Sequence, residues 1–195
     1  MQLDRTAADE ERPCATETVR RLATQAFRGP VNAADMNDLM AFYEQGRKDG
    51  DFENGIRLAV QAILANPRFL FRVEQAPATA TGPYRLGDLE LASRLSFFLW
   101  GSVPDAELIK VATAGTLKQA STLDRQVARM LVDPRSEALA TRFGAQWLRL
   151  QDVEKVRPDG INYPQWDQSL TESMRKETEL FFASLVREDR SVLDL

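Results

Sequence analysis

Two side chains suggest acid–base chemistry: the carboxylate of Glu177 and the guanidinium of Arg94. On a helical projection of the C-terminal segment, Glu177 lies beside Leu170 and Phe181, at the edge of an apolar stripe. A carboxyl group held against apolar neighbours can act as a general acid or base. Glu177 with an arginine such as Arg94 is therefore our catalytic hypothesis. The structural alternative is that Glu177 reaches water or an arginine, and that Arg94 pairs with Glu90, four residues earlier.

Cys14 is the single cysteine of the chain, and we expect it in the first turn of a helix that begins at Pro13. At that position the helix dipole favours a thiolate, so the side chain could be reactive. A plain free thiol is a second interpretation. We favour a third, a disulfide to a partner outside this chain.

The residue inventory restricts metal and haem chemistry. The chain has no histidine, which excludes Ser-His-Asp and Cys-His catalysis, zinc sites of the Cys/His type and a Cys-x-x-Cys-His haem attachment. Asp152, Glu154 and Asp159 share one predicted loop and could hold a hard cation, but they lack the ligand spacing of a calcium loop. We therefore expect neither a metal nor a cofactor in this chain.

Three arginines, Arg135, Arg142 and Arg149, recur every seven residues and share one face of the helix expected there. This face could bind an anion, but a solvated face opposite the apolar side is the simpler interpretation. On the apolar flank, Gly144 is expected to permit a close helix contact. We expect the tryptophans to be core or interface anchors rather than ligand platforms: Trp100, Trp147 and Trp166.

Composition narrows the range of partners. The 195 residues carry a formal net charge of −4, with charged side chains of both signs at 28%, so the basic excess of a nucleic-acid-binding protein is missing. No apolar run approaches the roughly 18 residues that a membrane span needs, and residues 1–5 lack the apolar core of a signal peptide. We therefore expect neither nucleic-acid binding nor membrane insertion.

Apolar residues recur at helical spacing along most of the chain, and no segment alternates for long as a strand does. The central helix is expected over 88–100, where apolar residues that include Leu95 and Phe98 cover more than half of the circumference. The other predicted helices run from Pro13 to Gly29, from an Asn32 cap to Gly46, from an Asp51 cap to Asn66, over 68–74, from Asp105 to Gly115, from a Ser121 cap to about 132, from Pro134 to about Leu150, and from a Ser169 capping box onward.

The segment Gln75–Pro83 has two prolines and no apolar period, so it is the predicted linker. It separates a small helical domain at 1–75, with three helices and a short fourth, from a helical domain at 84–195. The predicted fold class is all-α, a multi-helix orthogonal or bundle array in two adjoining helical units.

Particular motifs resemble two uncharacterised bacterial families. The domain of unknown function fifteen-ninety-two is similar to this chain in five segments: 86–100, 104–108, 130–135, 146–148 and 177–182. Residues 14–15, 26–31 and 55–74 are similar to its usual neighbour, the domain of unknown function fifteen-ninety-five. The resemblance covers about residues 13–195.

This resemblance implies a fragment of a larger secreted or periplasmic protein of the planctomycete type, with further helical domains and often a c-type cytochrome domain. Haem c would then lie on a separate domain. The family often shows arginine at the position of Gly29, and an upstream cysteine that could pair with Cys14 is absent here. The family pattern continues beyond Leu195, so we expect the second domain to be truncated at its C-terminus. No catalytic residue is carried over.

We therefore expect a helical scaffold or interaction module of unknown biochemical activity, from a larger extracytoplasmic protein that could pass electrons through an attached cytochrome. Its partners would be other domains of the same polypeptide or other proteins, and we lean against an enzyme in this fragment. The alternative is part of an extracellular hydrolase or oxidoreductase, with the carboxylate and arginine site at Glu177 and Arg94.

Overall fold

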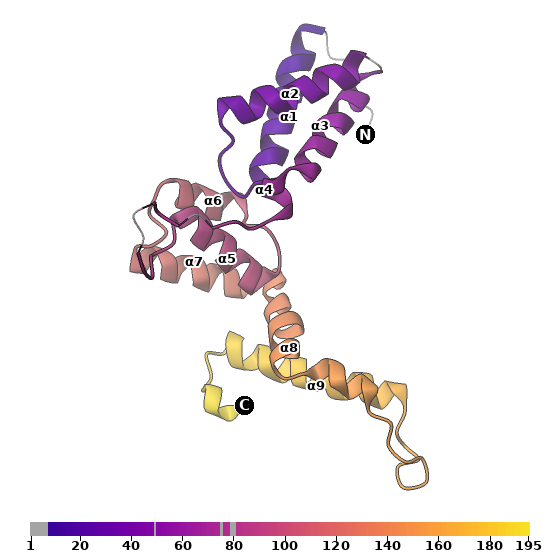
Figure 1. The fold of residues 1–195 in the computed structure, drawn as a ribbon. Helices are drawn as coiled ribbons and strands as arrows, with labels where there is room; N and C mark the ends of the chain where they lie inside the picture. The colour runs from indigo at the N-terminus through magenta and orange to yellow at the C-terminus, as the bar shows by residue number, and fades with distance from the viewer. Residues whose placement is uncertain (1–7, 49, 75, 79–80) are drawn as a thin grey trace. The chain divides into compact units, whose positions relative to one another are not determined.

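The computed structural model describes residues 8–48, 50–74, 76–78 and 81–195, and it confirms the all-α class. Over these residues the chain forms helices and no strands (Figure 1). The α-helices are α1 (Ala8–Ala26), α2 (Ala33–Lys48), α3 (Phe52–Ala65), α4 (Pro67–Leu70), α5 (Asp88–Trp100), α6 (Ala106–Thr113), α7 (Ala120–Val132), α8 (Ala145–Trp147) and α9 (Gln168–Arg187). Short 3-10 helices occupy Pro134–Ser136, Leu150–Lys155 and Val192–Asp194, and a π-helix occupies Leu139–Gly144.

The chain divides into two compact units. The N-terminal unit contains the described residues up to Ser93 together with Val103–Leu117, and the C-terminal unit contains Arg94–Ser102 and Lys118–Leu195. α5 contributes residues to both units. The predicted domains at 1–75 and 84–195 stay a prediction, and the linker expected between them lies partly outside the described residues.

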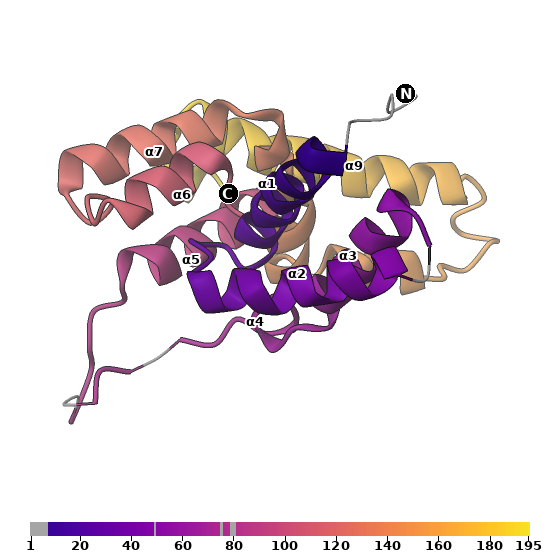
Figure 2. The ribbon, with the colours of Figure 1, turned by 90° about the horizontal axis from the view of Figure 1, so that it is seen from above.

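The N-terminal unit has a core of three helices, α1, α2 and α3, which lie side by side (Figure 1 and Figure 2). The predicted caps of α2 and α3 are confirmed. Asp35 donates its backbone N–H to Oδ1 of Asn32 at 2.8 Å, while Asn32 donates its own N–H to Asp35 Oδ2 at 3.2 Å. Asp51 accepts from the N–H of Asn54 at 3.0 Å. The buried core residues are Ala15, Val19, Ala23, Phe27, Met36, Leu39, Met40, Tyr43, Ala59 and Ile63.

Several predicted helix boundaries are wrong. α1 is already helical at Ala8, so Pro13 lies inside the helix rather than at its start. α2 continues through Gly46 because this glycine packs tightly against the next helix: a Cβ there would lie 2.5 Å from the backbone oxygen of Asn54. α4 ends at Leu70 instead of reaching residue 74.

The N-terminal caps of two later helices also differ from the prediction. Gln119, not Ser121, precedes α7, and it makes no side-chain capping bond. Asp167 caps α9 by accepting from the N–H of Leu170 at 2.7 Å, so Ser169 lies inside the helix. Asp167 rather than Ser169 caps α9 because its charged oxygen is the stronger acceptor for a free N–H at the start of a helix.

The buried stripe of α5 is also different from the one expected. Its buried positions are small or polar at Asp88, Ala92 and Ser96, and then Leu99 and Trp100 follow. Leu95 is only partly buried and Phe98 is 51% exposed. Small side chains let neighbouring backbones approach closely, which a projection weighted by apolar size does not detect.

A buried arginine joins two of the segments that carry the resemblance in the N-terminal unit, 26–31 and 55–74. Arg28 has a left-handed backbone, with φ of 58°, and its residue is 9% exposed. Its guanidinium donates to the carbonyl oxygens of Arg68 at 2.6 Å and Phe71 at 2.8 Å, with a longer bond to Phe69 at 3.4 Å. These carbonyls belong to α4 and the residue that ends it, where no further helical turn can supply donors. Burial, followed by the nearby charges of Arg72 and Arg68, lowers the pKa of Arg28.

Replacing this arginine tests its structural importance. We expect Arg28→Met to reduce the free energy of unfolding by about 2–3 kcal/mol, because partly buried carbonyls lose their charged donor. Arg57→Met is the matched control, since Arg57 is exposed and donates only to the side chain of Asn54; it should change stability by less than about 0.5 kcal/mol. Urea denaturation of both variants gives the comparison, and equal stabilities would contradict the assignment.

Tyr43 provides a pH-dependent contact in the same unit. Its hydroxyl donates to Glu11 Oε1 at 2.7 Å, and the same carboxylate binds Arg47 at 2.6 Å. Burial, and then the hydrogen bond to Glu11, raise the pKa of Tyr43 to about 12.

Because this pKa is raised, Tyr43 should make the folded chain less stable at alkaline pH. In the unfolded chain a tyrosine loses its proton near pH 10, whereas folded Tyr43 keeps it to about pH 12. The contribution of Tyr43 is therefore complete below about pH 10 and is lost as the pH rises towards 12. We expect the stability difference between the natural chain and Tyr43→Phe to shrink across this window, as measured by urea denaturation. A difference that is constant from pH 8 to 12 would contradict the prediction.

Candidate functional site

The C-terminal unit exposes a cluster of aromatic rings, formed by Phe98, Phe143, Trp147 and Phe182 (the aromatic cluster). Phe143 contacts Phe98 edge to face with ring centroids 5.2 Å apart, and it stacks on Trp147 at 5.8 Å. Both Phe143 and Trp147 also contact Phe182, at 6.3 and 6.4 Å. Phe182 is buried at 6% exposure, whereas Phe98, Phe143 and Trp147 are 51%, 41% and 55% exposed. Phe143 and Trp147 thus rest on one buried ring, and Phe98 packs against Phe143.

An irregular backbone brings these rings together. The single helix predicted from Pro134 to about Leu150 is wrong, because the chain changes from a 3-10 turn to a π-helix, then to α8, and breaks at Arg149, whose φ is 57°. The π-helix packs on α9 through Gly144, where a Cβ would lie 3.1 Å from the ring of Phe182. The expectation that Gly144 permits a close helix contact is confirmed.

The three regularly spaced arginines are all exposed, as the solvated interpretation expects, but each one binds a different group. Arg135 stacks on the ring of Trp100 at 3.5 Å and pairs with Asp133 at 2.7 Å. Arg142 donates to the carbonyl oxygen of Gly101 at 2.7 Å. Arg149 pairs with Asp152 at 2.6 Å. The change of backbone between them removes the common helical face on which the prediction depended.

The three tryptophans lie in different environments. Trp100 is a core anchor as expected, 3% exposed, and its indole N–H donates to the carbonyl of Met130 at 2.9 Å. Trp147 is at the surface in the aromatic cluster. Trp166 is partly buried and lines a pocket. Near Trp100, the side-chain and backbone hydrogen bonds from Arg135 lower the pKa of Asp133 to about 2.

The residues of the catalytic hypothesis are both exposed, Glu177 on α9 and Arg94 on α5. The side chain of Glu177 has no hydrogen bond or ion pair with another described residue. The buried carboxylate of α9 is instead Glu179, which is 7% exposed and binds Arg175 Nε at 3.0 Å. The signal for Glu179 is present in the sequence, since Arg175 lies four residues earlier on the same helical face. The carboxylate and arginine hypothesis stays a prediction that this geometry does not favour.

Cys14 is exposed on α1. Because α1 is already helical at Ala8, Cys14 lies at least a full turn inside the helix. The dipole effect is confined to the first turn, so the argument for a reactive thiol is lost. The disulfide to a partner outside this chain stays a prediction.

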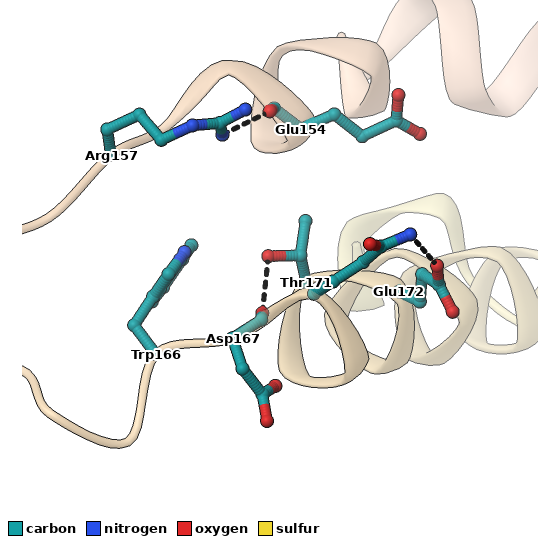
Figure 3. Close-up of a pocket in the computed structure, with 7 residues that line it drawn as sticks. Glu154, Arg157, Trp166, Asp167, Thr171 and Glu172 are labelled. Atoms are coloured by element: carbon teal, nitrogen blue, oxygen red, sulfur yellow. Dashed lines mark hydrogen bonds between the residues drawn. The ribbon is translucent and has the colours of Figure 1, made fainter.

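A polar pocket of about 550 Å³ lies between the Leu150–Lys155 segment and the start of α9 (Figure 3). Figure 3 shows Trp166 and Thr171 directed towards the segment that carries Arg157 and Glu154, while the side chain of Asp167 points away from it. The pocket is lined by Glu154, Arg157, Trp166, Asp167, Gln168, Thr171 and Glu172.

Hydrogen bonds fix most of the polar groups of this pocket. Arg157 Nη1 donates to the carbonyls of Glu154 at 2.6 Å and Val156 at 2.9 Å. Gln168 donates to the carboxylate of Glu172 at 2.8 Å. The two walls are joined by Arg175, which binds Glu154 at 2.6 Å and also holds Glu179.

The acidic loop residues considered for a hard cation are used in other ways. Asp152 lies between Lys155 at 2.8 Å and Arg149, whose hydrogen bonds lower its pKa. Asp159 accepts from the side chain of Asn162 at 2.5 Å. Within the described part of the chain, no group of three or more metal-ligating side chains is suitable for a metal ion.

Comparisons with known proteins agree with the two resemblances. Residues 86–195 match the family described as Protein of unknown function (DUF1592), and residues 14–74 match the one described as Protein of unknown function (DUF1595). The first match covers more than half of the chain, so this all-α protein belongs to the DUF1592 family. No curated protein and no solved structure matches it. Among the described residues, none of the helices is long and apolar enough to cross a membrane.

The contact between Gly144 and Phe182 can be tested directly. We expect Gly144→Val to reduce the free energy of unfolding by about 2–3 kcal/mol, because its branched side chain would displace the ring of Phe182. Gly160→Val is the control, since nothing lies within 4 Å of the position of its Cβ. Near-ultraviolet circular dichroism should show loss of the aromatic signal only in Gly144→Val. A natural spectrum and stability for Gly144→Val would show that the helices are not in close contact.

Proposed function

We propose that this chain is a helical scaffold and interaction module of a larger extracytoplasmic protein, and that the aromatic cluster is its docking surface. The observation that carries this proposal is the exposure of Phe98, Phe143 and Trp147 over a buried ring. Exposed aromatic groups of this kind mark interaction sites more often than isolated apolar residues do.

The cluster has the physical properties of a binding hot spot. Tryptophan is enriched at hot spots, and rings have few rotatable bonds to restrict on binding. Here the rings already contact one another, at 5.2 and 5.8 Å, so little further ordering is needed. A preorganised apolar surface supports a protein partner in preference to a small solute.

Charge favours a particular kind of partner surface. Arg142 precedes Phe143 in the sequence and is exposed, and its guanidinium donates to the backbone carbonyl of Gly101. Among the described residues no carboxylate pairs with it, and such a positive charge favours acidic groups on the opposite side. The proposed occupant is therefore a folded domain with an apolar patch bordered by carboxylates, and other domains of the same polypeptide are the first candidates.

The proposed setting is periplasmic or secreted, in a planctomycete-type protein that also carries a c-type cytochrome domain. This part rests on the family resemblance described above. Haem c would be held by a separate domain, because the present chain has one cysteine and no histidine and cannot supply a Cys-x-x-Cys-His attachment. No step of electron transfer is assigned to residues of this chain.

Calorimetric titration with the segments that flank this chain in its intact gene product tests the docking surface. We expect saturable binding by the natural chain, and a loss of at least about 2 kcal/mol, roughly 30-fold in Kd, for Trp147→Ala. Phe98→Ala should weaken binding in the same direction, since it removes another ring of the cluster.

Val132→Ala is the matched control, because Val132 is 86% exposed on α7 and lies outside the aromatic cluster. It should bind as the natural chain does. Thermal melting by circular dichroism confirms that each variant is folded. The proposal fails if Trp147→Ala binds normally, or if no flanking segment binds the natural chain.

A further inference from the structure

The polar pocket at the start of α9 is not used by the docking proposal, and its lining calls for another ligand. The lining combines one indole, from Trp166, with a guanidinium, a carboxamide and carboxylates. Its volume of about 550 Å³ lies within the range of small-molecule sites. A pocket in which one aromatic ring faces mixed hydrogen-bond donors and acceptors suits a ligand with one apolar face and several polar edges.

The lining carries more negative than positive charge, with the carboxylates of Glu154, Asp167 and Glu172 and the guanidinium of Arg157. Glu154 shares Arg175 with Glu179, at 2.6 and 3.0 Å, and the side chain of Asp167 points away from the pocket (Figure 3). A small anion therefore gains no electrostatic advantage from this lining, and the titration with choline below tests whether a cation is preferred.

Other ligand classes fit less well. A purely apolar ligand would take water away from the remaining donors and acceptors of the carboxylates, the carboxamide and the guanidinium without replacing its hydrogen bonds, which is costly. A metal ion lacks its ligands, because the described residues contain no suitable group of three or more acidic side chains. A neutral polyhydroxylated ring matches both features: its C–H face can lie on an indole, and its hydroxyls can donate to carboxylates and accept from amide and guanidinium groups.

The polar groups are held in place before any ligand binds. Arg157 is fixed by two backbone carbonyls, at 2.6 and 2.9 Å. Gln168 and Glu172 hold each other at 2.8 Å, and Thr171 is buried and bonded to the carbonyl of Asp167 at 3.0 Å. Arg175 ties the two walls together through Glu154 and the buried Glu179. Preorganised groups need less ordering on binding, which favours recognition of a weakly binding neutral ligand.

We propose that the polar pocket of residues 154–172 is a binding site for a neutral saccharide unit, with Trp166 as the stacking surface and Arg157, Gln168 and Glu172 as the hydrogen-bonding groups. This site is separate from the aromatic cluster and does not depend on it. The proposed activity is sugar binding alone, with no covalent step.

Titration calorimetry with defined sugars tests the proposal. The probes are neutral hexasaccharides of glucose, mannose, galactose and xylose, with a sulfated hexasaccharide and choline as charged comparisons. We expect saturable binding of at least one neutral hexasaccharide and weaker binding of both charged probes. Trp166→Ala should weaken the neutral sugar at least 10-fold, and Glu172→Ala, at an exposed position, should weaken it about 3-fold or more.

Trp147→Ala is the matched control, because it removes a tryptophan from the aromatic cluster and should leave sugar binding unchanged. Thermal melting separates a folded Trp166→Ala from an unfolded one, and Glu172→Ala keeps the test available if Trp166→Ala does not fold. The proposal is overturned if no neutral hexasaccharide binds, if choline or the sulfated sugar binds more tightly, or if Trp147→Ala removes the binding while Trp166→Ala keeps it.

Discussion

Backbone carbonyls at the ends of short or interrupted helices are the constraint on which much of this structure depends. A helix leaves its last carbonyls without intrahelical donors, and in a partly buried position they need donors from elsewhere. In this chain, long side chains supply them. Arg28 binds the carbonyls at the end of α4, Arg142 binds Gly101 just after α5, and the indole of Trp100 binds Met130 in α7. Each of these bonds joins segments at least 30 residues apart in the sequence.

This constraint gives a physical meaning to the motifs that identify the family. The segments 26–31 and 66–74 meet through the guanidinium of Arg28, and residues 100–101 meet 130–142 through Trp100, Arg135 and Arg142. The contacts of Arg28 lie within the N-terminal unit, and those of Trp100, Arg135 and Arg142 lie within the C-terminal unit. These contacts therefore show that parts of the motifs serve to join helices.

Regular helices could be predicted from the sequence, whereas irregular ones could not. α5 spans Asp88–Trp100, as the apolar period predicted. The segment 134–155 was missed because a π-helix and a left-handed Arg149 depend on what α9 offers for packing, and local spacing carries no sign of that. The same reason explains the stripe on α5, where tertiary packing selects Ser96 over the larger Leu95. Which side chains of a helix are buried depends on how closely the neighbouring helices approach. The size of the apolar side chains is therefore a weak guide to the buried face of a single helix.

The candidate sites, too, could be predicted from the sequence only in part. The sequence places Phe143 and Trp147 four residues apart on an apolar face, but only the packing of Phe182 decides that their rings remain at the surface. The pocket joins residues 154–157 to residues 166–172, which no periodic pattern connects.

α9 is the element that both surfaces share. Its first turns line the pocket, while Phe182 supports the aromatic cluster about eleven residues further on, roughly 16 Å along the helix axis. A stiff helix holds two such surfaces at a fixed separation, and the ion pairs of Arg175 with Glu154 and Glu179 lie between them. Glu179 is buried, so loss of Arg175 would leave its charge without its nearest partner, with Lys176 at 3.9 Å as the remaining cation. The constraint on Arg175 is therefore stronger than on an ordinary surface arginine, because one guanidinium both offsets a buried charge and sets the width of the pocket.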